Sequence, residues 1–188
     1  MLIISLLLLI GPEERTLGVN VRVVYLHGAW VWAALVCILT SAGAGLIGLI
    51  ARREELQFWS RALGRSGLVF WMTYLPISLW AMEANWNGFF FAEPRWRLGL
   101  TFAIAGLLLQ GGLAFLGDLE WASGFNVLYA FFLILALLTS EEVLHPTNPI
   151  FGSDAWRIRL FFIILFLTAL VAAWHLTRWF RKADSRPG

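Results

Sequence analysis

Charged residues are scarce in this chain. Of its 188 residues only 14% are charged and 60% are hydrophobic, and the mean hydropathy is +0.74. Soluble domains carry about 25% charged residues, so the composition excludes an ordinary soluble domain. The net charge is only +2, and the arginines fall in loops and at helix ends, which argues against a nucleic-acid-binding surface. The composition predicts an integral membrane protein with a single domain, residues 1–188.

Cysteine and the common catalytic motifs are almost absent. The single cysteine, Cys37, lies inside an apolar run, so it cannot form an internal disulfide and is expected to be a buried thiol. No Ser/His/Asp or Cys/His arrangement, phosphate-binding loop or pair of intramembrane carboxylates is found. We therefore expect no enzyme activity and no ion-driven transport. Charged residues avoid the expected helix interiors, which argues against a small-solute permease.

Apolar runs dominate the rest of the chain and predict an all-α, polytopic transmembrane helix bundle of about six spans. The first run, Met1–Ile10, covers roughly half of the hydrocarbon thickness. It lacks a basic segment before it and a small-residue cleavage site after it, so we interpret it as a short first helix rather than a signal peptide. The other helices are expected at 28–50, 67–82 with a kink at Pro76, 98–117, 122–139 and 158–180. They leave a polar connection at 13–25, a basic loop at 51–65, an aromatic loop at 83–97 and a loop at 140–157.

The arginines and lysines favour one orientation of these spans. With the basic loop 51–65 in the cytoplasm, that side carries eight Lys and Arg residues against six on the other. The aromatic loop and the 140–157 loop then both face outward, and a bacterial inner (cytoplasmic) membrane is the expected location. Within the bundle, small residues such as Ala44, Gly48 and Gly106 favour close helix packing. Gln110 and Asn126 are expected to form hydrogen bonds between helices.

The aromatic loop is the most unusual segment. It contains the run W-N-G-F-F-F-A-E-P-R-W-R from Trp86 to Arg97, in which five aromatic rings accompany one carboxylate. Rings of this kind are typical of the membrane interface, and they also suit the face of a flat apolar ligand.

Two of the three histidines are expected at the level of this loop. His27 begins the second helix, and His145 lies just beyond the fifth. Imidazoles that approach a ligand from opposite sides, beside aromatic rings, fit a haem, with Arg22, Arg95 and Arg157 as candidate propionate partners. Each of these side chains is equally typical of an interfacial polar residue. Zinc is less favoured because no second His or Cys has ligand spacing, and His175 is expected in the opposite interfacial belt.

Several segments resemble the CcmC-type haem-handling proteins of cytochrome c maturation. V-R-V-V-Y-L-H-G-A-W resembles the start of their second helix, and W-N-G-F-F-F-A-E-P-R resembles their tryptophan-rich segment, roughly W-G-x-W-W-x-W-D-x-R. L-H-P-T stands where the family has its second outer histidine. Phe89 and Phe90 replace family tryptophans, Ala92 replaces another, and Glu93 falls at the Asp position.

The resemblance implies that b-type haem is held at the outer face and passed to a partner haem chaperone, beside subunits of an ABC-type transporter. His27 and His145 would be the axial ligands that bind the metal. Trp86, Phe89, Phe90, Glu93 and Arg95 would complete the cofactor site.

The lost tryptophans keep a second hypothesis open. Phenylalanine has no indole N–H to donate, so the haem-handling role could have been replaced by an accessory or structural one in a larger respiratory or photosynthetic membrane complex. The aromatic loop would then contact lipid, a quinone, a pigment or neighbouring helices.

Overall fold

The protein is an assembly of six α-helices in the computed structural model, which describes residues 2–140 and 155–184. The helices are α1 (Leu2–Ile10), α2 (Val21–Ile50), α3 (Glu54–Trp86), α4 (Pro94–Leu116), α5 (Leu119–Thr139) and α6 (Trp156–Asp184). All regular elements among these described residues are helical, which confirms the predicted all-α class.

Four of these helices, α2, α4, α5 and α6, are long and apolar enough to cross a membrane, which indicates an integral membrane protein. The short first helix is also present, with nine residues. The 33-residue α3 is not among the four, and it carries Glu54, Glu55, Arg61 and Arg65 in its first half. It runs without interruption through Pro76.

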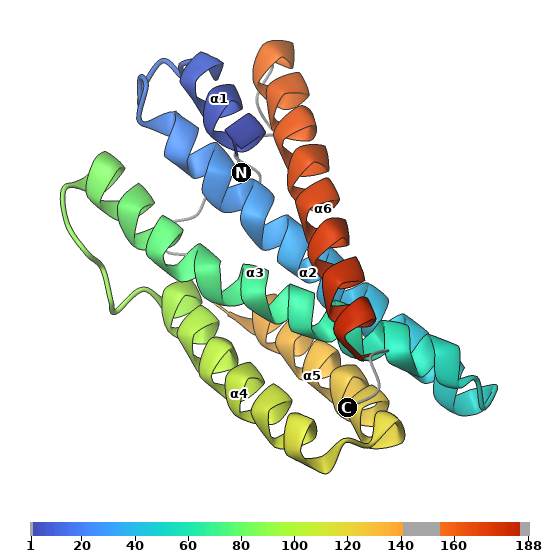
Figure 1. Ribbon diagram of the computed structural model, residues 1–188. Coiled ribbons are helices and arrows are strands. Elements are labelled where there is room, and N and C mark those ends of the chain that lie inside the picture. Colours follow the sequence, from blue (N-terminus) through green and yellow to red (C-terminus); the bar gives the residue numbers. More distant parts are fainter. Residues whose placement is uncertain (1, 141–154, 185–188) are drawn as a thin grey trace.

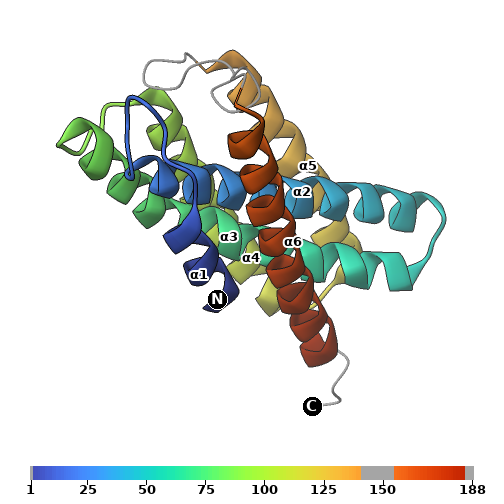
Figure 2. The same cartoon turned by 90° about the horizontal axis from the view of Figure 1, so that it is seen from above.

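The α2–α3 hairpin is the centre of the bundle (Figures 1 and 2). α3 packs against α2, α4, α5 and α6, whereas α6 packs against α1, α2 and α3. The hairpin therefore separates α1 and α6 from α4 and α5. A helix with polar and charged residues is tolerated at this place because its neighbours supply partners for them.

Two predicted connections are wrong because helices extend into them. α3 begins at Glu54, so most of the predicted basic loop 51–65 is helical, and only Ala51–Arg53 form the turn. Acidic Glu54 and Glu55 favour a helix N-terminus there. α2 begins at Val21, within the predicted connection 13–25. In both places hydropathy marks the expected membrane span, and the helix continues beyond it into polar sequence.

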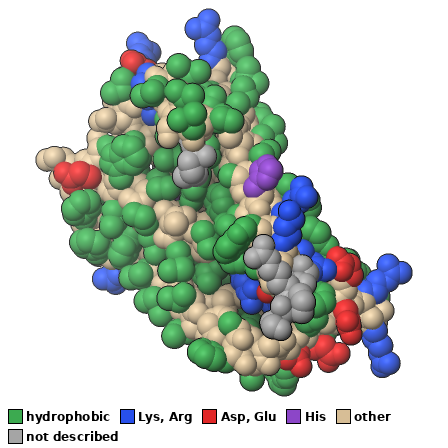
Figure 3. Space-filling model, viewed as in Figure 1, with side chains coloured by type: hydrophobic (Ala, Val, Ile, Leu, Met, Phe, Trp, Pro, Cys, Tyr) green, Lys and Arg blue, Asp and Glu red, His purple; other side chains and the backbone are tan. Residues whose placement is uncertain are grey.

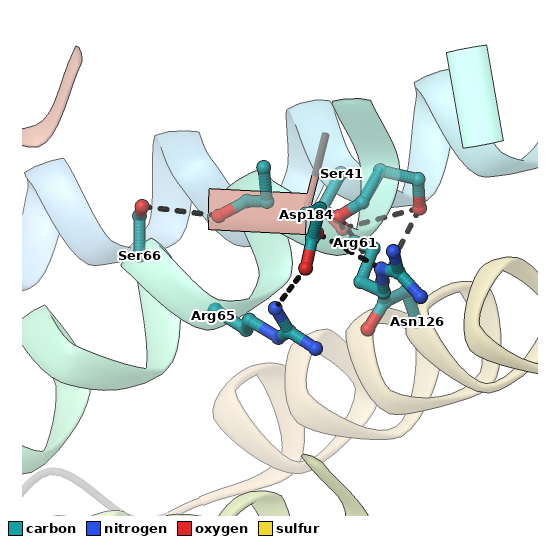
Figure 4. Close-up of polar contacts among 8 residues, drawn as sticks. Ser41, Arg61, Arg65, Ser66, Asn126 and Asp184 are labelled. Carbon is teal, nitrogen blue, oxygen red and sulfur yellow. Dashed lines mark hydrogen bonds and ion pairs between the residues drawn. The ribbon is translucent and has the colours of Figure 1, made fainter. Parts of the chain in front are cut away.

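Polar side chains link four helices in the interior of the bundle. The Asn126 amide donates to the Ser60 carbonyl (3.1 Å), and the Ser41 hydroxyl donates to the same carbonyl (2.6 Å) (Figure 4). The Asn126 side chain also accepts a hydrogen bond from Gln110 (2.9 Å). The expected hydrogen bonds of Gln110 and Asn126 are thus confirmed. Gly64 makes room for the network, because a Cβ there would lie 2.8 Å from the Asn126 amide.

Ion pairs join α3 to the end of α6. Arg61 Nε lies 3.0 Å from one Asp184 oxygen, and Arg65 Nη1 lies 2.8 Å from the other (Figure 4). Arg181 Nη2 lies 2.7 Å from Glu55 Oε2. Arg61 and Arg65 were expected in a loop, and they lie on α3 and hold it against α6. The orientation in the membrane stays a prediction.

The surface carries many hydrophobic side chains and a group of charged ones. On the face seen in Figure 3 hydrophobic side chains predominate, and a mixed group of acidic and basic side chains gathers near the α2–α3 turn. Large apolar side chains such as Phe115, Leu138 and Ile50 are more than three-quarters exposed. Such an apolar surface is suited to lipid.

Candidate functional site

The start of α2, the end of α3 and the start of α4 meet at one end of the bundle, which we call the loop end. The Asn20 amide, just before α2, donates to the Ala84 carbonyl of α3 at 2.6 Å. His27 lies two turns into α2, and the aromatic loop follows α3 directly. The structure therefore brings the predicted ligand His27 to the same end as the loop.

His27 packs against Tyr74, a residue that the sequence analysis missed. The two ring centroids are 5.7 Å apart in an edge-on arrangement, and Tyr74 is buried. Tyr74 in turn meets Trp71 edge-on at 4.9 Å. The i, i+3 spacing of Trp71 and Tyr74, which puts both rings on one face of a helix, is the signal that could have found them.

The start of α4 completes this group. The Trp71 indole N–H donates to the Gly99 carbonyl at 3.0 Å, and the Tyr74 hydroxyl occupies the space that a side chain at position 99 would need. His27, Tyr74, Trp71 and Gly99 thus form a continuous contact from α2 through α3 to α4.

The aromatic loop is shorter than predicted. α3 ends at Trp86, Asn87 adopts the left-handed conformation that ends many helices, and α4 begins at Pro94. The predicted loop 83–97 is thus helical at both ends. Trp86, Phe89, Phe90 and Phe91 are all at least two-fifths exposed. Phe91 forms ring contacts with Phe89 (6.0 Å) and Trp96 (5.1 Å), which order the loop. The exposed rings form an aromatic surface on the molecule.

Glu93 is the N-cap of α4. Its carboxylate accepts a hydrogen bond from the Trp96 backbone N–H at 2.5 Å, and Pro94 occupies the first helical position. A carboxylate before a proline is a helix-start pattern, since it satisfies a free N–H and complements the helix dipole. Glu93 is also almost fully buried. The predicted loop carboxylate therefore has a structural role in addition to any role in a cofactor site.

Replacing Glu93 with alanine is expected to destabilise the protein by about 1 kcal/mol, because one backbone donor at the start of α4 loses its partner. Glu93→Ser, which can still cap the helix, should recover most of that loss. Thermal unfolding in detergent measures both variants. Equal stability of the alanine and serine variants would show that the cap contributes nothing.

The arginines in the first turns of α2, α4 and α6 differ in their contacts. Arg22 donates to the Gly11 carbonyl (2.9 Å) and lies 3.6 Å from Glu13, and Arg97 donates to the Phe91 carbonyl (3.1 Å). Both therefore stabilise local chain segments. Arg157 lies over the Trp156 ring at 5.7 Å, as an interfacial anchor would. Arg95 is half-buried in the first turn of α4, directly after the aromatic loop.

The connection between α1 and α2 is folded around Glu14. Its carboxylate accepts from the backbone N–H groups of Leu17 (3.0 Å) and Thr16 (2.8 Å). These bonds, that from Leu17 above all, lower the pKa of Glu14. Because the pKa is lowered, the exposed Glu14 carboxylate makes a small contribution to folding stability. This contribution is present above the ordinary glutamate pKa and is lost as the pH falls through the lowered value.

The other residues that the sequence singles out are His145, His175 and Cys37. His145, the second predicted ligand, is outside the described residues. His175 is exposed on α6, where the Trp59 and Trp174 rings stack at 5.3 Å. Cys37 is buried with a free thiol, as expected. In residues 2–140 and 155–184 no group of three His, Cys, Asp or Glu side chains could hold a metal ion.

The comparisons with known proteins add no relative. No family model, curated protein or solved structure matches this chain. The resemblance to CcmC-type proteins therefore rests on the quoted residues.

Proposed function

We propose that this protein binds a b-type haem at the loop end and passes it to a partner during cytochrome c assembly in a bacterial inner membrane. It would act as a carrier, with no catalytic step of its own. The observation that carries the proposal is the position of His27, which shares one end of the bundle with the exposed aromatic loop and Arg95.

The residues present fit a haem better than a bare metal ion. A haem needs only one or two imidazoles from the protein, since the porphyrin supplies the other ligands, and no cluster of three ligating side chains is required. Exposed phenylalanines offer faces for stacking, and a guanidinium pairs well with a propionate. His27 would be one axial ligand and His145 the other. The haem would be the cargo, and the residues of this chain would bind and orient it.

Titration of the purified protein with haemin tests the proposal. The wild-type protein should give the absorption spectrum of a low-spin, bis-histidine haem, in both oxidation states. His27→Ala should weaken binding by at least about tenfold and remove the low-spin spectrum, because one axial ligand is lost. His175→Ala, at the other end, is the control and should behave as wild type. A wild-type protein that takes up no haem would refute the proposal.

A second candidate is an accessory subunit of a larger membrane redox complex. Two observations favour it: Phe89, Phe90 and Phe91 are exposed, and Glu93 is already engaged as a helix cap. The loop would then contact neighbouring helices, a quinone or a pigment. Stoichiometric co-purification with a redox complex supports this candidate, whereas transient association with a haem chaperone or an ABC-type transporter supports the first.

A further inference from the structure

The Tyr74 ring is held on several sides. Its edge-on contacts with His27 (5.7 Å) and Trp71 (4.9 Å) involve α2 and α3, and only 5% of the residue is exposed. Edge-on aromatic contacts favour particular orientations of both rings. The orientation of Tyr74 therefore limits the orientations open to the His27 imidazole.

The start of α4 holds the other end of this side chain. The Tyr74 hydroxyl occupies the space that a Cβ would take at position 99, which is free because this residue is glycine. The neighbouring Trp71 indole donates a hydrogen bond to the Gly99 carbonyl. Because the backbone of α4 is in direct contact with the hydroxyl, Tyr74 cannot move toward α4. The ring is thus fixed by α4 on one side and meets the imidazole on the other.

We propose that Tyr74 is the positioning residue for His27, and that the close approach of α4 at Gly99 holds it in place. This inference rests on the proposed function in one respect, since it assigns His27 a ligand to hold. An imidazole with a fixed ring plane loses less rotational freedom on binding iron. Residues that orient a metal ligand typically change metal affinity by about 10–100-fold when they are replaced.

The first test needs no haem, because it reads His27 directly. Nuclear magnetic resonance of the histidine ring protons should show a contact between His27 and Tyr74 in the wild-type protein. Tyr74→Phe keeps the ring and its contact with Trp71 and loses only the hydroxyl contact with Gly99, so it should shift the His27 signals slightly. Tyr74→Met, which fills much of the same space without a ring, should shift and broaden them. Unchanged His27 signals in a folded Tyr74→Met variant, or no contact in the wild type, would overturn the inference.

A matched control separates positioning from general loosening of the bundle. Tyr129 also packs on α4, with its hydroxyl donating to the Phe102 carbonyl at 2.8 Å and lying against Gly106. Tyr129→Met should therefore disturb the contact of α4 with α5 and leave the His27 signals at their wild-type positions. An equal shift of His27 in both methionine variants would contradict a specific role for Tyr74.

The second test uses haemin. Tyr74→Met should bind it at least about tenfold more weakly than Tyr74→Phe and give a changed electron paramagnetic resonance spectrum, because the imidazole plane is no longer fixed. If the wild-type protein takes up no haem, the proposed function fails, and the resonance data alone decide whether Tyr74 positions His27. If haem binds and Tyr74→Met keeps the wild-type affinity and spectrum, the positioning role fails while the proposed function stands.

Discussion

Replacing Gly99 with alanine should destabilise the protein by about 2–3 kcal/mol, the upper part of the usual range for overpacked cores. A Cβ at this position would overlap the Tyr74 hydroxyl and lie 2.7 Å from the ring carbon that bears it. The Tyr74 side chain cannot easily move because it is buried, and α4 cannot easily move because a hydrogen bond joins it to Trp71. Unfolding of the variant in detergent or nanodiscs measures the loss.

The same helix provides the control for this prediction. A Cβ added at Gly112 would have open space around it, so Gly112→Ala should leave stability unchanged or raise it slightly through helix propensity. Adding Tyr74→Phe to Gly99→Ala should recover part of the loss, because the overlapping hydroxyl is removed while the ring carbon stays close. Equal effects of the Gly99 and Gly112 substitutions would show that α3 and α4 do not approach as closely as described.

Replacing Asp184 with asparagine should destabilise the protein by about 2–3 kcal/mol, since two guanidiniums lose a charged partner in a mostly desolvated place. The Asp184 side chain is only 10% exposed, and those of Arg61 and Arg65 are 11% and 22% exposed. Asparagine keeps the shape and one acceptor, so the measured loss reports mainly the missing charge. The expected result is a lower midpoint of thermal unfolding, with the end of α6 opening first in hydrogen exchange.

Glu55 offers a matched comparison at the same contact between α3 and α6. Its carboxylate also pairs with one arginine, Arg181, but it is 65% exposed. Glu55→Gln should therefore cost less than about 1 kcal/mol, and salt should reduce even that. If the two substitutions had equal and small effects, burial of the Asp184 pair would not matter for stability.

The fold could be predicted from the sequence to a large extent, but the helix ends could not. Long apolar runs indicate membrane helices because only such segments satisfy the backbone without water. Hydropathy, however, marks where the apolar part of a helix ends, not where the hydrogen-bonded backbone ends. This is why Glu54–Arg65 of α3 and Val21–Tyr25 of α2 were expected to be loops and are helical.

The candidate site was predictable only in its residue types. An imidazole and several rings at one end follow from the order of the helices, and the structure brings His27 and the aromatic loop together as expected. Tyr74 could have been noticed from its i, i+3 spacing with Trp71. Gly99 could not be assigned to the site, because its importance comes from a contact between α3 and α4 across 25 positions in the chain. Glu93 was assigned to the cofactor, although the helix-start pattern Glu93–Pro94 already indicated a cap.

The sequence by itself determined that the protein is helical and apolar, with aromatic rings concentrated in one connection, because composition and hydropathy act residue by residue. Only the tertiary structure decided which polar side chains meet. It pairs Arg61 and Arg65 with Asp184, joins Ser41, Ser60, Gln110 and Asn126 in the interior, and sets Tyr74 between His27 and Gly99. Such pairings depend on how helices are rotated and shifted against one another, which close packing sets and hydropathy does not encode.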